Sequence, residues 1–112
     1  AGTAREWRSD VNGTFVYMWE FNVRPEADAS FLEAYAAGGL WTELFRKGSG
    51  FVETRLFQDE AAPGRYVTMD VWESEKAYRE FLAEFADEYD ALDQHCESFM
   101  DAERALGEFR SI

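Results

Sequence analysis

Thiol and imidazole side chains are almost absent from this sequence, which contains one cysteine, Cys96, and one histidine, His95. A single thiol excludes a disulfide within the chain and fits a reducing compartment. One histidine and one thiol also exclude a Cys/His metal cluster built from a single chain. No glycine-rich phosphate loop or dinucleotide-binding pattern appears. We therefore expect a cytoplasmic protein that works without a metal or flavin cofactor.

Basic residues are also scarce, with 11 Lys and Arg against 23 Asp and Glu, which gives a net charge of −12. A field of this sign repels phosphate groups, so nucleic acid and anionic membrane surfaces are excluded as partners. No apolar run has the length of a transmembrane helix, and the N-terminal residues lack the apolar core of a signal peptide.

Aromatic residues, by contrast, are abundant: ten Phe, five Tyr and four Trp make up 17% of the 112 residues. A chain of this length forms one compact domain with a modest core. Such a core does not need so many rings. The excess predicts a ligand pocket, a large subunit interface, or both.

Period-two alternation of β-branched and aromatic residues predicts strands at 14–23, 51–58 and 65–72, the last two joined as a hairpin through the turn at 59–64. A helical stripe begins near Ala27 and is interrupted at Gly38-Gly39, which predicts a kink or two short helices.

Ser74 is expected to cap a long helix that runs to Cys96. A short helical piece at 101–106 and a final strand at 108–112 are expected to follow, with Gly107 between them. Residues 1–12 are interpreted as a flexible arm and 13–112 as a single domain. The order β-α-β-β-α-β predicts a ferredoxin-like α+β fold, with one antiparallel sheet and helices on one face.

The uncovered face of this sheet would expose several large apolar side chains in a monomer. Packing two copies face to face would bury them, so a homodimer is expected.

Three segments carry a resemblance to a known family: VYMWEFNVRP at 16–25, WTELFRKGSGFVETRLF at 41–57 and RYVTMDVWESEKAYREF at 65–81. They resemble the antibiotic biosynthesis monooxygenase (ABM) family of the dimeric α+β barrel superfamily, from about Phe15 to the C-terminus. The resemblance implies a dimeric barrel made of two ferredoxin-like domains and an oxidoreductase activity.

Two branches of the family imply different site residues. Haem-degrading members carry a tryptophan and a haem-ligating histidine where this chain has Phe81 and Ala91, and His95 lies one helical turn further on. Members that oxidise anthrones and related phenols without a cofactor retain the counterparts of Trp72 and Tyr78. They carry an asparagine where this chain has Thr68.

The cofactor-independent branch implies chemistry in which the substrate itself reacts with O2. A phenolate or enolate can give one electron to triplet oxygen, so the protein supplies a dry aromatic cavity, a proton acceptor and donors for the anion. Trp72 and Tyr78 are the predicted catalytic residues, with Trp72 expected at the mouth of the pocket. The predicted substrate-binding residues are Thr68, Trp41, Tyr35, Phe81 and Phe85.

Other interpretations stay open. The rings of Trp72 and Tyr78 could simply pack in the core, and His95 could lie at the surface or an interface. Asp70 and Arg55 are charges within strand patterns, which favours a cross-strand or intersubunit ion pair. For the whole protein, a non-catalytic small-ligand binding or accessory domain is the main alternative, and a haem-binding enzyme is the third.

Overall fold

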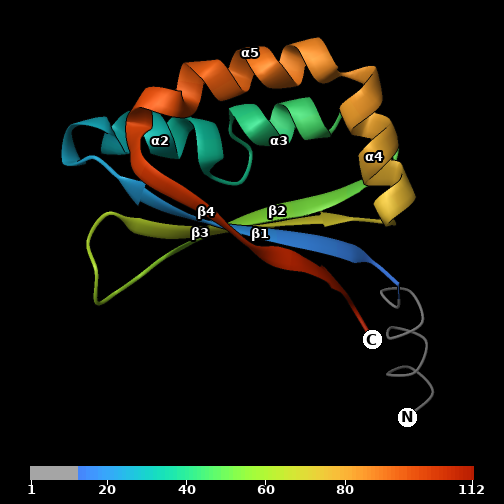
Figure 1. Ribbon diagram of the computed structural model, residues 1–112, viewed down its shortest axis with the longest axis horizontal. Helices are drawn as coiled ribbons and strands as arrows, with labels where there is room; N and C mark the ends of the chain where they lie inside the picture. The colour runs from blue at the N-terminus through green and yellow to red at the C-terminus, as the bar shows by residue number, and fades with distance from the viewer. Residues whose placement is uncertain (1–12) are drawn as a thin grey trace.

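The computed structural model describes residues 13–112, in which a four-stranded antiparallel sheet carries all its helices on one side (Figure 1). The predicted arm at 1–12 lies outside the described residues. The strands follow the order β2-β3-β1-β4. Their bounds are Phe15–Val23 for β1, Phe51–Gln58 for β2, Arg65–Trp72 for β3 and Met100–Arg110 for β4. The ferredoxin-like α+β prediction is confirmed.

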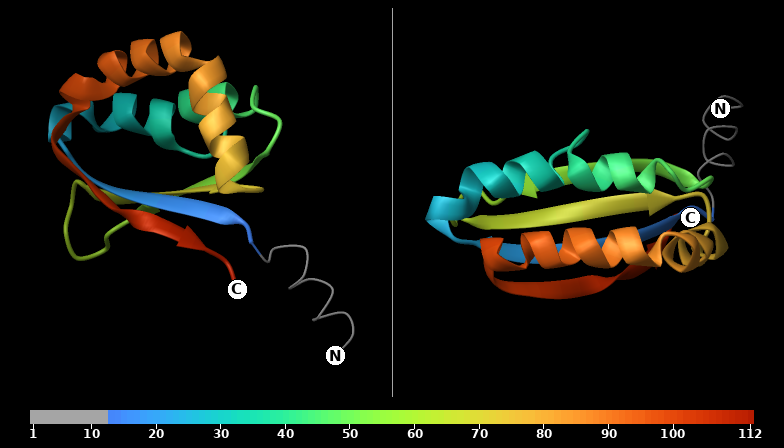
Figure 2. Two further views of the ribbon diagram at one scale, coloured as in Figure 1. Left: turned by 45° about the vertical axis from the view of Figure 1, so that its right-hand side comes forward. Right: turned by 90° about the horizontal axis from the view of Figure 1, so that it is seen from above.

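The helical layer lies above the sheet and leaves the opposite face open (Figure 2). No helix within residues 13–112 is both long and apolar enough to cross a membrane. The bounds are Pro25–Ala27 for η1, Asp28–Tyr35 for α2, Leu40–Phe45 for α3, Glu75–Glu84 for α4, Ala86–Cys96 for α5 and Glu97–Phe99 for η2.

Alternation along β1 decides which side chains meet the helices. Phe15, Tyr17, Phe21 and Val23 are buried, while the even-numbered residues of the strand point to the open face. The residues opposite them on β3 face the helices too; Trp72, for example, is opposite Phe15. The helix-facing side of the sheet is therefore rich in aromatic rings.

The structure corrects the helix that was predicted at 101–106. These residues belong to β4, which pairs with β1 over almost its whole length. Good helix formers in this stretch are overridden by strand pairing. The pairing shifts register between Met18 and Trp19, and Leu106 is the extra residue at that point. Gly107, with φ +147°, adopts a backbone conformation that other residues avoid.

The helix after β3 begins as predicted but does not continue unbroken. Ser74 Oγ accepts a hydrogen bond from the Ala77 amide at 3.0 Å, which confirms the cap. At Phe85 the backbone leaves the helical region, with φ −111° and ψ 29°, and α5 starts at Ala86. The break lets α5 turn and run along the sheet beside α2 and α3 (Figure 2).

Candidate functional site

A cavity of about 190 Å³ lies between the sheet and the helices. Its floor comes from the helix-facing side of three strands and mixes aromatic rings with hydroxyl and carboxyl groups. The floor residues are Tyr17, Trp19 and Phe21 of β1, Thr54 of β2, and Thr68 and Asp70 of β3.

The roof and one edge of the cavity come from three helices and β4. Rings again predominate, but two carboxylates join them. These residues are Tyr35 of α2, Trp41 and Phe45 of α3, Tyr89 and Asp93 of α5, and Glu103 of β4.

Asp70 is the buried carboxylate of the floor, with 6% of its surface exposed. It pairs with Tyr17 on one side and Thr54 on the other, so three polar side chains form a row across three strands. The Thr54 hydroxyl donates a hydrogen bond to Asp70 Oδ1. Burial raises the pKa of Asp70 to about 6, and the hydrogen bonds from Thr54 and Tyr17 hold it from rising further. At neutral pH this carboxylate is ionised but retains affinity for a proton.

Tyr17 is a neutral donor beside that carboxylate. Burial, and then the negative charge of Asp70, raise the pKa of Tyr17 well above its ordinary value. Its ring lies 4.7 Å from the ring of Tyr78, centroid to centroid. The phenol therefore keeps its proton throughout the physiological range and stabilises the ionised form of Asp70.

The charges around the cavity are all of one sign. Besides Asp70, the lining carries Asp93 and Glu103, and no Lys, Arg or His of residues 13–112 joins it. Burial and neighbouring carboxylates raise the pKa values of both Asp93 and Glu103. Such a site holds a proton readily and disfavours an anionic ligand.

The structure brings together only part of the predicted site. Thr68, Trp41 and Tyr35 line the cavity. The remaining predicted site residues do not line it; they are Trp72, Tyr78, Phe81 and Phe85.

Trp72 is fully buried, so the expectation that it lies at the mouth of the pocket is wrong. Phe45, Phe51 and Phe81 surround its indole, with ring centroids 5.8, 5.4 and 4.9 Å away. The turn between α3 and β2 closes over the ring, because a Cβ at Gly48 would lie 2.9 Å from Trp72 Cζ3. The strand-helix junction is thus sealed by the preceding turn.

The indole N–H of Trp72 has no acceptor in hydrogen-bond geometry among the described residues. Its ring packs against those of Tyr78 and Phe45, with centroids 5.7 and 5.8 Å away. The Tyr78 ring in turn contacts that of Tyr17, at 4.7 Å between centroids. Both predicted catalytic residues therefore contact a cavity residue instead of lining the cavity.

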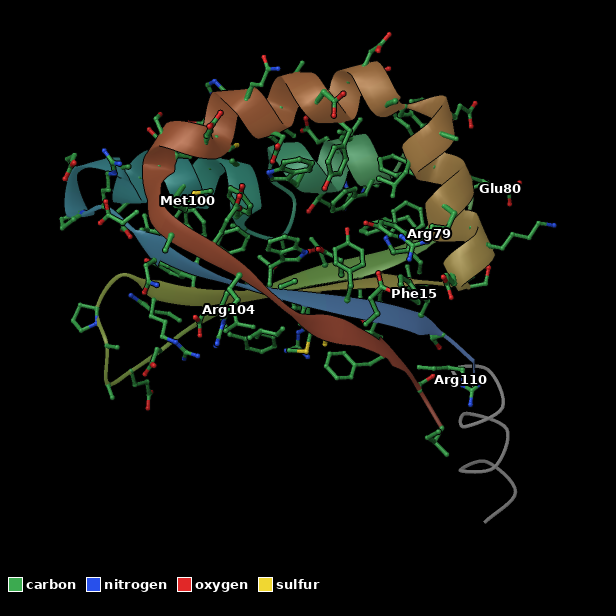
Figure 3. The ribbon with its side chains drawn as sticks, viewed as in Figure 1. Phe15, Arg79, Glu80, Met100, Arg104 and Arg110 are labelled. Atoms are coloured by element: carbon green, nitrogen blue, oxygen red, sulfur yellow. The ribbon has the colours of Figure 1, made fainter. Side chains whose placement is uncertain are left out.

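Arg79 of α4 lies beside the rings of Phe15 and Tyr78 (Figure 3). Its guanidinium lies 5.9 Å from the Phe15 ring centroid and 5.1 Å from that of Tyr78. Arg79 Nη2 also pairs with Glu108 Oε2 at 3.0 Å, which ties α4 to β4. The Tyr78 ring is held against β1 by these contacts.

The expected ion pair of Asp70 with Arg55 does not form within the chain. Arg55 lies on the open face, where its guanidinium is 5.3 Å from the Phe57 ring centroid. The ion pairs across strands that do form join Glu20 Oε2 to Arg65 Nη2 at 2.5 Å and to Arg104 Nη2 at 3.4 Å, also on the open face. Asp70 has no cation partner among residues 13–112.

His95 lies on the exposed side of α5, with its ring 5.5 Å from that of Phe99. It does not line the cavity. No group of three or more His, Cys, Asp or Glu side chains in the described part of the chain could hold a metal ion.

Sequence reasoning left several lining residues unassigned, among them Tyr17, Trp19 and Thr54. The alternation of β1 places Tyr17 and Trp19 on one face and could have identified both. A lone Asp in an otherwise apolar strand was the signal for Asp70. Tyr89 of α5 and Glu103 of β4 reach the cavity only through tertiary packing, so no local sequence pattern identifies them.

Solved structures share this architecture. A conserved protein from Methanosarcina mazei aligns at 14% identity with a TM-score of 0.69, covering 96% of this chain and 99% of that chain. SnoaB, a cofactor-independent oxygenase from Streptomyces nogalater, aligns at 21% identity with a TM-score of 0.60, covering 89% and 94%. A Nitrosomonas europaea protein, provisionally named an antibiotic biosynthesis monooxygenase, aligns at 14% identity with a TM-score of 0.73, covering 90% and 92%. Identities this low establish the fold alone.

No curated protein is significantly similar to the chain. The family model for antibiotic biosynthesis monooxygenases, however, matches residues 14–100. That span includes β1, the whole helical layer and the β2–β3 hairpin, and so most of the cavity lining. The chain belongs to the antibiotic biosynthesis monooxygenase family.

Proposed function

We propose that the protein is a cofactor-independent monooxygenase that oxidises a small anthrone-, phenol- or quinol-like substrate with O2. The observation that carries the proposal is the aromatic cavity with an ionisable carboxylate, Asp70, in its floor. Aromatic walls suit a flat ring, and the volume of about 190 Å³ is below the ~300 Å³ at which ligand pockets usually begin. A compact aromatic molecule is favoured.

The overall reaction converts a methylene group beside the aromatic ring, or a ring C–H, to an oxygenated carbon. For an anthrone-like substrate, the methylene group and one O2 molecule give a carbonyl group and one water molecule. Loss of a proton gives the anion, which passes one electron to O2. The radical pair combines at carbon, the peroxide takes up a proton, and cleavage of its O–O bond with loss of the second C–H proton releases water. The protein needs only proton transfer and a dry site for these steps.

Trp72 and Tyr78 enter the proposal as positioning residues. Tyr78 contacts Tyr17, which lines the cavity and is the direct neighbour of Asp70 on the adjacent strand. Trp72 contacts Tyr78 and the lining residue Phe45. Thr68 offers a hydroxyl from the floor, and Tyr35 and Trp41 cover a bound ring from the roof. Phe81 and Phe85 support the site indirectly, outside the cavity lining. Phe81 packs on Trp72, and Phe85 packs on Phe81.

The residues present do not fit the haem alternative. A haem-ligating histidine would have to face the cavity, whereas His95 lies on the exposed side of α5. A cavity of about 190 Å³ is also too small for a porphyrin ring. The proposal therefore contains no step through haem.

We propose further that two copies pack through their open sheet faces. Val16, Met18, Val67 and Met69 alternate with the helix-facing residues and lie on that face. Phe57 joins them at the β2 edge with 42% of its surface exposed. Covering these side chains with a second sheet removes apolar surface from water. A stable monomer at micromolar concentration in sedimentation would contradict this assembly.

Oxygen uptake by the purified protein, measured against a panel of anthrones and hydroquinones, tests the activity. We expect uptake that depends on substrate and saturates, with a preference for one- or two-ring compounds. If several of these compounds bind but none is oxidised, the protein is instead a non-catalytic ligand-binding or accessory member of the family.

A further inference from the structure

The cofactor-free reaction requires a group that takes a proton from the substrate. We infer that Asp70 is that group: its carboxylate in the cavity floor accepts the hydroxyl proton of a phenol or enol bound against the aromatic roof. The inference rests on the proposed function for the identity of the substrate, but the proton transfer itself needs no oxygen.

The position of Asp70 favours direct contact with a ligand. It lines the cavity, yet only 6% of its surface is exposed. An ionised carboxylate offers about four lone-pair positions, and the Thr54 hydroxyl occupies one of them. The Tyr17 phenol beside it is a second donor that favours the ionised form. Acceptor capacity therefore remains for a hydroxyl from the ligand.

A buried carboxylate normally needs a cation, and Asp70 has none within residues 13–112. The ionisable groups around it are Tyr17 on β1, Tyr78 on α4, and Tyr89 on α5, all phenols with raised pKa values. Asp93 and Glu103 add negative charge at the cavity edge. Burial therefore raises the proton affinity of Asp70, no described cation lowers it, and only the hydrogen bonds from Thr54 and Tyr17 oppose the rise.

The other candidates for proton acceptor are weaker. Tyr17, Tyr35 and Tyr89 line the cavity, but burial raises the pKa of each, so none is ionised at neutral pH. Asp93 and Glu103 lie on α5 and β4 at the cavity edge, away from the buried floor. Asp70 combines burial in the floor with an orienting donor, Thr54. Its pKa of about 6 also matches a base that operates near neutral pH.

The step transfers one proton and no electrons. The O–H bond of the substrate breaks, its electron pair stays on oxygen, and the proton binds an Asp70 carboxylate oxygen. The protonated carboxyl can return that proton to the peroxide that forms after O2 has added. Asp70 is thus regenerated in each turnover.

The test is anaerobic binding of 4-nitrophenol, whose anion absorbs at longer wavelength than the neutral phenol. The parent and Asp70→Asn are compared slightly below the pKa of the free probe, with Asp70→Glu as the variant that keeps a carboxylate. We expect the parent to show, on binding, a saturating anion band together with the infrared band of a newly protonated carboxyl group, because the proton moves within the site and the net charge of the site is unchanged. D70N should bind the probe without that carboxyl band, and D70E should restore part of it.

An anion band in the parent without the carboxyl band, a bound probe that stays neutral, or no binding to the parent would overturn the inference. The aerobic experiment separates this result from the proposed function. If D70N oxidises a non-ionised hydroquinone within a few-fold of the parent rate, the monooxygenase proposal stands and Asp70 is not the base. If the anion and carboxyl bands form together in the parent but no compound is oxidised, Asp70 accepts the proton and the monooxygenase proposal fails. For an active parent we expect D70N to lose ~10²- to 10⁴-fold in kcat/KM.

Discussion

Tyr17 and Asp70 lie directly opposite each other on β1 and β3, and both side chains face the helices. A phenol and a carboxylate thus share the floor of an aromatic cavity without a cation beside them among residues 13–112. Adjacent positions on neighbouring strands hold side chains about 5 Å apart, so the sheet fixes the spacing of the pair. This geometry makes the charge of Asp70 depend on hydrogen bonds and burial, which leads to several measurable consequences.

The first prediction concerns stability against pH. The pKa of Asp70 is raised from 3.8 to about 6 on folding, so the folded state binds the proton more tightly than the unfolded chain. The free energy of unfolding should therefore fall as the pH rises through this window, by at most roughly 3 kcal/mol for this group. Asp70→Asn should remove that part of the decline and be more stable than the parent above pH 6. Urea unfolding at several pH values measures it.

Asp101→Asn is the control for that measurement, because Asp101 is exposed and pairs with Arg24 at the surface. Its pH dependence should follow the parent curve. A D70N protein that loses stability above pH 6 would show that the ionised carboxylate stabilises the fold, contrary to this prediction.

The second prediction ranks the donors around Asp70. Removing a hydrogen bond to the carboxylate should raise its pKa further, and the Thr54 hydroxyl contributes more than that of Tyr17. Thr54→Val should therefore raise the pKa of Asp70 more than Tyr17→Phe does. The carboxyl carbon signal in a carbon-13 NMR titration reports this value without any substrate. Tyr66→Phe is the matched control, since the Tyr66 hydroxyl donates to Asp28 and not to Asp70.

If neither substitution moves the Asp70 titration, or if Y66F moves it as much, the hydrogen-bonded row across the three strands does not control this carboxylate.

The third prediction separates the two residues at the strand-helix junction. Trp72→Phe removes volume from a fully buried site and should lower the free energy of unfolding by roughly 1–3 kcal/mol. Tyr78→Phe removes one hydroxyl and should change stability much less. Because both act through residues that line the cavity, Tyr78 through Tyr17 and Trp72 through Phe45, each should lower kcat by about ten-fold and leave KM unchanged. This loss is smaller than that of a direct proton-transfer group.

A rise in KM at constant kcat in either variant would indicate direct contact with the substrate. Unchanged kcat in both would remove these residues from the mechanism and leave them as packing groups.

The fourth prediction addresses the dimer. Phe57→Glu places a charge on the open sheet face and should shift the protein to monomer in sedimentation at micromolar concentration. Leu32→Glu, on the outer side of α2, is the matched control because the two side chains are similarly exposed, at 42% and 37%. It should leave the dimer intact. Equal behaviour of the two variants would rule out the proposed interface.

Much of the fold follows from local pattern, and the exceptions have physical causes. Alternation in 14–23, 51–58 and 65–72 predicted three strands within one residue of their bounds. The fourth was missed over 101–106 because its residues favour a helix locally, while β1 offers an unpaired edge that only the assembled sheet provides. The helix break at Phe85 was not predicted because no glycine or proline lies at that position.

The site was less accessible to sequence reasoning. Thr68 and Trp41 were predicted and do line the cavity. Trp72 was misplaced because its depth depends on the turn at Gly48, which closes over it from another part of the chain. Asp70 was interpreted as half of an ion pair. The sequence alone does not reveal that the residue opposite it on β2 is Thr54.

The most direct test of the central claim is a turnover experiment with isotopically labelled O2. The parent protein, dialysed against a chelator and free of flavin absorption, is mixed with the best hydroquinone or anthrone of the panel, and the product is analysed by mass spectrometry. We predict one labelled oxygen atom in each product molecule, with D70N forming product far more slowly. Unlabelled product, or activity that disappears on dialysis and returns with added iron or flavin, would contradict the claim.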